Sequence, residues 1–185
     1  FRTARLMVGR RKGGLAHVNI LASLIFSGIS GAALADIGGL GKIEIKAMKD
    51  QGYDGGDAAA ITAASATIGP IFPPSIPLII FATVAEVSGI KLLIAGVVPA
   101  LIITALLMVV VTVMAHVKKY PKDDLVTPRK EAIRQILNAL PALFAPILLA
   151  GGLISGWCSP TEVAPVTVAY SLILGLFFYR ELTWK

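Results

Sequence analysis

The sequence predicts an all-α, polytopic membrane protein. Of its 185 residues, 56% are hydrophobic and 15% are charged, whereas soluble domains carry about 25% charged residues. The charges form short blocks between long uncharged runs, as in proteins that cross a membrane several times. Most of these runs reach or approach the ~20 residues that a membrane-spanning helix requires. The runs are Gly13–Ala35, Ala58–Ala85, Leu92–Val117, Gln135–Thr161 and Val163–Tyr179.

The first uncharged run is predicted to enter and leave the membrane on the same side. Basic residues mark cytoplasmic segments, and they occur both before this run, in residues 1–12, and after it, in residues 42–50. A single crossing cannot join two segments on one side, so Gly13–Gly41 is predicted to be a re-entrant helical hairpin. Small residues allow close packing of such a tip. The tip is placed at Ser27, Gly28, Ser30 and Gly31.

The second run, Ala58–Ala85, is predicted to be a helix that is broken near the middle of the membrane. Its centre reads GPIFPP (Gly69–Pro74), and proline removes an amide donor and opposes a continuous helix. Carbonyl groups left unpaired in this loop can bind a cation. Amide groups at the start of the second half-helix, near Ser75, can bind an anion. Broken helices of this kind build the ion and substrate sites of secondary transporters.

Three further spanning helices are predicted: Leu92–Val117 and two within residues 135–185, the last beginning at Pro160. The distribution of basic residues places Glu86–Lys91 outside the cell and the linker 118–134 in the cytoplasm, near anionic membrane lipid. The chain is thereby divided into four regions. These are 1–57, a cytoplasmic basic segment and the hairpin; 58–117, the broken helix and the following helix, as a transport domain; 118–134, the basic linker; and 135–185, two transmembrane helices.

Three ordered blocks resemble the large membrane subunit, of the DctM type, of tripartite ATP-independent periplasmic (TRAP) transporters. The blocks are SGISGAALADIGGLGKIEIKAMKDQGYD, AAAITAASATIGPIFPPSIPLIIF and SPTEVAPVTVAYSLILGLFFYRELTW. The resemblance implies sodium-coupled import of an organic acid, such as a C4-dicarboxylate or sialic acid, across the bacterial inner membrane. It also implies two partners, a small membrane subunit and a periplasmic substrate-binding protein. The fold would be one inverted repeat of an elevator-type ion transporter, and the chain an internal piece of a longer protein.

The resemblance also assigns a site for sodium and substrate to the hairpin tip and the broken-helix loop. The chain departs from the family at Ala32, where relatives often have serine, so backbone carbonyl groups would have to serve there. The resemblance implies sodium as the coupling ion, and no other cofactor is expected. The implied site residues are Ser27, Gly28, Ser30, Gly31, Thr67, Gly69, Pro70, Pro73, Pro74 and Ser75.

Other functions fit the sequence less well. An intramembrane enzyme would need paired acid–base groups, and the only carboxylate in an apolar context is Asp36. Asp36 is either functional, as carboxylates inside a membrane usually are, or a cap for the Gly-rich turn after it. A structural scaffold would have unbroken helices, and a nucleic-acid-binding protein would spread its basic residues over a surface. The alternative that stays open is an elevator-type anion carrier that needs no binding protein.

Overall fold

The structure, a computed structural model, describes residues 13–121, 137, 140–142, 144–149, 151–152, 155 and 160–178. Within these ranges every regular element is a helix and none is a strand, which confirms the predicted all-α class. The predicted basic segment 1–12, the linker from residue 122 to residue 134 and the loop before Pro160 lie outside the described residues.

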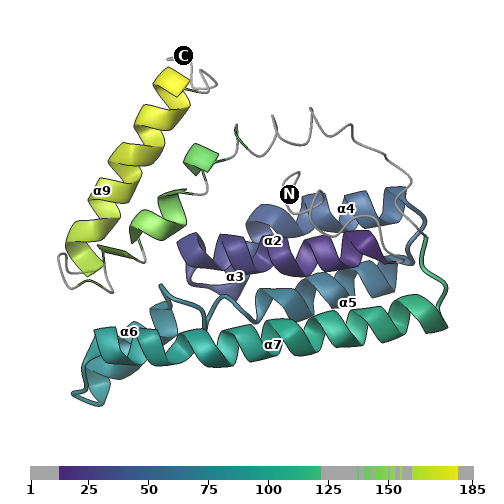
Figure 1. The fold of residues 1–185 in the computed structure, drawn as a ribbon, viewed down its shortest axis with the longest axis horizontal. Helices are drawn as coiled ribbons and strands as arrows, with labels where there is room; N and C mark the ends of the chain where they lie inside the picture. Colours follow the sequence, from purple (N-terminus) through teal and green to yellow (C-terminus); the bar gives the residue numbers. More distant parts are fainter. Residues whose placement is uncertain are drawn as a thin grey trace.

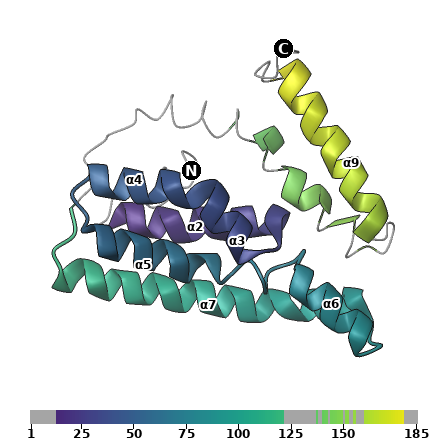
Figure 2. The same cartoon turned by 180° about the vertical axis from the view of Figure 1, so that it is seen from behind.

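The first helices form a hairpin (Figures 1 and 2). Helix α2 (Gly14–Ser30) ends at Gly31, whose φ of 62° is left-handed, and Ala32 is extended. The chain then returns through α3 (Ala33–Asp36), the π-helical turn η1 (Ile37–Gly41) and α4 (Lys42–Asp50). The reversal therefore falls at the predicted tip.

The return arm of the hairpin differs from the prediction in two ways. It does not end at Gly41, because the helix continues through the basic segment to Asp50. Lysine, glutamate and methionine favour helix, and Glu44 and Met48 are buried four residues apart while the lysines of α4 face outward. The Gly-rich stretch after Asp36 is helical, and the Asp36 side chain makes no capping hydrogen bond. The capping role considered for Asp36 is therefore wrong.

The second apolar run is broken, as predicted. Helix α5 (Gly55–Ala66) and helix α6 (Ile76–Val84) are separated by the loop 67–75. Each half begins with a side-chain cap, as helices in globular proteins commonly do. The Asp54 carboxylate accepts hydrogen bonds from the amides of Gly56 and Asp57, and the Ser75 hydroxyl accepts one from the Leu78 amide.

Helix α7 (Gly89–Val117) lies along α2 and α5 on the side opposite α4, so the four helices form a layered bundle (Figure 2). The core between these layers is apolar. His17 Nε2 lies 2.9 Å from Thr112 Oγ1 and joins α2 to α7. The core residues include Leu15, Ile20, Met48, Ile61, Ile68, Ala100, Val111 and Ala115.

Helix α7 is, in the described part of the chain, the one helix long and apolar enough to cross a membrane. Its 29 residues span about 43 Å, which exceeds the hydrocarbon core of about 30 Å. The side chains turned away from the bundle are large and apolar, as contact with lipid requires. These include Val98, Leu101, Ile102, Leu106, Val109 and Val113.

The last helix, α9 (Pro160–Ile173), begins at the predicted proline and continues as the π-helical turn η2 (Leu174–Phe178). The Tyr170 hydroxyl donates a hydrogen bond of 2.9 Å to the Pro141 carbonyl oxygen. The rings of Phe144 and Tyr170 meet edge to face, with centroids 6.0 Å apart. These contacts attach α9 to the helical residues 140–149 that precede it.

Replacing Gly31 by alanine is expected to destabilise the full-length permease that contains this chain. The left-handed conformation alone costs a residue with a Cβ atom about 1–2 kcal/mol, and that Cβ atom would overlap the Pro74 carbonyl oxygen. Thermal unfolding in detergent measures the loss. Gly38→Ala is the matched control, because a Cβ atom at Gly38 meets no atom within 4 Å. Equal melting temperatures for the two variants would contradict this tip geometry.

Candidate functional site

The hairpin tip and the broken-helix loop contact each other through backbone atoms. The Ile76 amide donates a hydrogen bond of 3.2 Å to the Gly31 carbonyl oxygen. On the other side of this contact, a Cβ atom added at Gly69 would lie 3.2 Å from the Ala32 carbonyl carbon. Glycine at these two positions therefore lets two non-helical segments, far apart in the sequence, meet without intervening side chains.

The structure brings the predicted site residues of both segments to this junction, but their hydroxyl groups differ in what they offer. Ser27 is fully buried and donates to the Ser23 carbonyl oxygen at 2.6 Å. Thr67 is exposed and donates to the Ala64 carbonyl oxygen at 2.6 Å. The Ser30 Oγ is buried without a hydrogen-bond partner among the described residues. Ser30 is therefore the hydroxyl in the tip that is free to bind a ligand.

The loop also presents unpaired backbone oxygens. In the described part of the chain, no hydrogen bond reaches the carbonyl oxygens of Gly69, Phe72 or Pro73. The Pro70 carbonyl accepts the Ser75 hydroxyl instead. The prediction that the prolines leave carbonyl groups without helical partners is confirmed.

Most amides at the start of α6 are already hydrogen-bonded, whereas the Ser75 amide has no partner among the described residues, so the anion site stays a prediction. The Ile76 amide is bonded to Gly31, Pro77 has no amide hydrogen, and the Leu78 amide is bonded to the Ser75 hydroxyl. The next amide, of Ile79, donates to the Ser75 carbonyl oxygen. The junction therefore offers oxygen acceptors, which suit a cation, and few donors for an anion.

A row of polar side chains between α2 and α5 supports the junction, and sequence reasoning missed it. Asn19 donates to Thr62 Oγ1 at 2.7 Å and accepts from Ser65 Oγ at 2.7 Å. Ser23 donates to Ser65 at 3.0 Å. The signal was in the sequence, because Asn19, Ser23 and Ser27 recur every four residues and so lie on one helix face.

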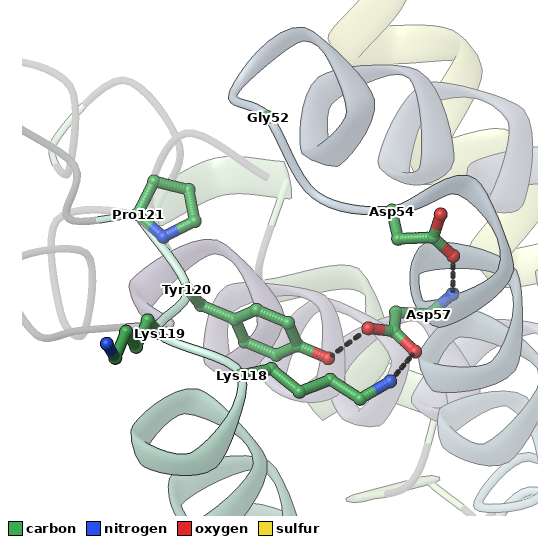
Figure 3. Close-up of a pocket in the computed structure, with 7 residues that line it drawn as sticks. All are labelled: Gly52, Asp54, Asp57, Lys118, Lys119, Tyr120 and Pro121. Atoms are coloured by element: carbon green, nitrogen blue, oxygen red, sulfur yellow. Dashed lines mark hydrogen bonds and ion pairs between the residues drawn. The ribbon is translucent and has the colours of Figure 1, made fainter.

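A second polar cluster holds the opposite end of the bundle together (Figure 3). Lys118 Nζ lies 2.5 Å from Asp57 Oδ1, and the Tyr120 hydroxyl donates to Asp57 Oδ2 at 2.9 Å. The Tyr120 ring packs on Tyr53 with centroids 4.7 Å apart. The end of α7 is thereby fixed to the start of α5, beside a surface cavity of about 330 Å³.

The Asp57 carboxyl in this cluster is held in its ionised form. The hydrogen bond from Lys118 lowers its pKa below the ordinary value of 3.8, and the bond from Tyr120 lowers it further against the opposing effect of burial. Burial, and then the hydrogen bond to the negatively charged Asp57, raise the pKa of Tyr120. Both groups keep their charge state at neutral pH, so the cluster is a structural clamp rather than an acid–base pair.

A membrane-length apolar helix, packed with a broken helix and a hairpin tip that leave backbone oxygens unpaired, is the arrangement typical of integral membrane transport proteins. The whole chain, residues 1–185, matches the family model described as "Tripartite ATP-independent periplasmic transporter, DctM component". The chain therefore belongs to the DctM family of TRAP transporters, as the sequence motifs predicted.

The chain is similar to several curated proteins that are named as transporter permeases and not as enzymes. It is 48% identical over 185 residues to the sialic acid TRAP transporter permease protein SiaT of Haemophilus influenzae, covering 100% of this chain and 30% of that protein. It is 43% identical to the sialic acid TRAP transporter large permease protein SiaM of Vibrio cholerae, covering 99% and 43%. It is 38% identical to the C4-dicarboxylate TRAP transporter large permease protein DctM of Pseudomonas aeruginosa, covering 97% and 42%. The chain thus spans less than half the length of these relatives.

Replacing Asp57 by asparagine is expected to lower the stability of the full-length permease at neutral pH by about 0.2–1 kcal/mol, the usual range for an exposed ion pair. Because the folded-state pKa is lowered, the stabilisation is present above pH 3.8 and is lost as the pH falls through the folded-state pKa. Parent and variant should therefore converge in acid. Melting temperatures measured from neutral to acidic pH test this.

Asp50→Asn is the control for this measurement, because Asp50 is an exposed carboxylate at the end of α4. A constant difference between parent and Asp57→Asn at all pH values would contradict an ionised, hydrogen-bonded Asp57.

Proposed function

We propose that this chain is part of the large permease subunit of a TRAP transporter that imports an organic acid with sodium as the coupling ion. The observation that carries the proposal is the backbone junction between Gly31 and Ile76, with the unpaired carbonyl groups of the loop beside it. Unwound backbone of this kind coordinates sodium in secondary transporters. It is tolerated at membrane depth only where it is buried in protein or lines a cavity.

Sodium would be bound by oxygen atoms from both sides of the junction. The Ser30 hydroxyl and the carbonyl groups of Gly69, Phe72 and Pro73 are the free candidates. Ser75 has a different role, because its hydroxyl is used within the loop and it sets the loop's shape. Gly28 permits close packing at the tip, since an added Cβ atom would lie 3.6 Å from the Phe72 ring and 3.1 Å from Pro146.

The substrate is proposed to be sialic acid or a related carboxylate. The two sialic acid permeases are 48% and 43% identical to this chain, and the C4-dicarboxylate permease is 38% identical. Since the Ile76 and Leu78 amides are already hydrogen-bonded and Pro77 has no amide hydrogen, the substrate carboxylate would be bound mainly by groups elsewhere in the permease. The permease is proposed to lie in the bacterial inner membrane. Its proposed partners are a small membrane subunit and a periplasmic substrate-binding protein.

The hairpin and the broken helix are proposed to move together as a transport domain, in one inverted repeat of an elevator-type fold. Support comes from the polar row of Asn19, Ser23, Thr62 and Ser65, which joins α2 to α5, and from the Asp57 clamp, which joins α5 to the end of α7. With both ends of the bundle connected, regions 13–57 and 58–117 would behave as one rigid unit.

Replacing Pro73 and Pro74 together by alanine is expected to weaken sodium dependence of uptake. Alanine supplies amide donors and favours helix, so the loop can pair carbonyl groups that would otherwise bind the ion. Losing one charge-assisted contact costs about 1.5–3 kcal/mol, which is about one to two decades in sodium affinity. Uptake against sodium concentration in proteoliposomes with the complete transporter measures it.

Pro99→Ala is the matched control, because Pro99 lies within α7 on an exposed face. If the double variant keeps the sodium dependence of the parent while Pro99→Ala also leaves it unchanged, the loop does not form the ion site.

Uptake is also expected to require a periplasmic binding protein. Proteoliposomes with the complete transporter and a sodium gradient should accumulate substrate only when the cognate binding protein is added, even at high free substrate. Without it, accumulation should equal that of empty liposomes. Full uptake without the binding protein would favour the alternative, an elevator-type anion carrier that takes free substrate.

A further inference from the structure

Two carboxylates are buried on the return arm of the hairpin, Asp36 one turn after Ala32 of the tip and Glu44 in α4. Asp36 is 2% exposed and Glu44 is 1% exposed. Neither carboxylate oxygen of Glu44 has a hydrogen-bond partner among the described residues, and the donor that Asp36 faces is the Ser23 hydroxyl. Both side chains belong to the return arm of the hairpin, which packs against α2 and α5 (Figure 2).

The π-helical turn η1 brings the two carboxylates onto one face of the return arm. Residues eight positions apart in an α-helix differ by about 80° around the axis. A π turn contains more residues per turn than an α-helix, and η1 lies between Asp36 and Glu44, so it removes most of this offset. Gly41, within the same stretch, packs against Thr62 of α5, since an added Cβ atom would lie 3.3 Å from the threonine methyl group. The return arm therefore packs against both other helices here, with Ser23 of α2 facing Asp36 and Thr62 of α5 against Gly41.

No basic group in the described residues is placed to neutralise these carboxylates. From α2, the single titratable side chain is His17, whose ring contacts the Gly13 carbonyl and Thr112 of α7. From α5, it is Asp57, which is bound by Lys118 and Tyr120. The lysines of α4 are exposed. The nearest polar groups are neutral: Ser23 faces Asp36, and Asn19 contacts Met48, one turn after Glu44.

An ionised carboxylate in this setting is costly. Moving an isolated charge into a low-dielectric interior is so unfavourable that the group normally becomes neutral instead. A single sodium ion does not neutralise both groups readily, because their backbone positions are about 12 Å apart along the helix. A proton needs no shell of ligands and neutralises each carboxylate separately.

We propose that Asp36 and Glu44 form a proton-binding site on the inner face of the return arm, where it packs against α2 and α5, and that this site takes protons rather than the sodium ion proposed for the tip. Each carboxylate group takes up one proton, on one of its two oxygens, when the helices pack and gives it to water when the interface opens. The hairpin thereby binds protons as well as contacting the ion site at its tip. This proposal does not depend on sodium coupling at the junction.

The test uses the full-length permease in detergent and the double variant Asp36→Asn, Glu44→Gln, which mimics the protonated side chains. The folded parent holds protons that the unfolded chain releases near neutral pH, so its stability should fall as the pH rises. The unfolding equilibrium constant should increase by up to about tenfold per pH unit for each proton held. The double variant should keep the stability of the parent at mildly acidic pH and lose this pH dependence. Asp50→Asn, an exposed carboxylate on the same arm, should behave as the parent.

Infrared spectroscopy of the parent gives a readout that does not require the double variant to fold. A protonated carboxyl group has a carbonyl stretch that an ionised carboxylate lacks, and this band should be present at neutral pH and decrease in Glu44→Gln. Absence of the band, or an unchanged pH dependence in the double variant, would overturn the proposal. So would a melting temperature that rises with sodium in the parent but not in the double variant, because the site would then bind a metal cation. The stability and infrared measurements do not depend on whether the junction binds sodium. A negative result in the sodium-dependence experiment would therefore leave this proposal standing.

Discussion

The close backbone contact between the hairpin tip and the broken-helix loop is the constraint on which the rest of this structure depends. Gly31 is left-handed, and neither Gly31 nor Gly69 has room for a Cβ atom without movement of the opposing backbone. Both segments lack regular helix at the contact, so each leaves backbone groups that a helix would have paired. One of them, the Gly31 carbonyl, is paired across the contact with the Ile76 amide, and the loop oxygens that stay unpaired are the ones available to an ion.

The packing of the helices around the junction holds the hairpin tip opposite the broken-helix loop. Inside an apolar bundle a polar side chain is stabilising only when its hydrogen bonds are made, and the row from Asn19 to Ser65 meets this condition. It fixes α2 on α5 at one height along their axes. The Asp57 clamp fixes α7 at the far end, where water is closer and an ion pair is less costly. The bundle is therefore cross-linked by neutral polar groups inside and by charges at its end.

The return arm is the exception to this pattern. Among the described residues neither Glu44 oxygen has a hydrogen-bond partner, and Asp36 faces only the Ser23 hydroxyl, although the neighbouring polar row is satisfied. π-helical turns are uncommon and frequent at functional sites, and here the turn sets the direction of both acids. A hairpin that carries neutral acids on its inner face and free oxygens at its tip would respond to protons and to metal ions through different atoms.

The sequence by itself determined the class of the protein, the family, the break at Gly69–Pro74 and the reversal near Gly31, because composition, proline and glycine act locally. It also located the loop carbonyl groups, since proline removes donors regardless of context. Tertiary structure decided the rest. The Ile76 amide is used because the tip packs on it, and Glu44 is buried because α4 continues as helix against α5. From the sequence, Glu44 is expected to be exposed because it lies in a basic segment. Its burial depends on α2 and α5, which are distant in the chain, so only the tertiary structure shows it.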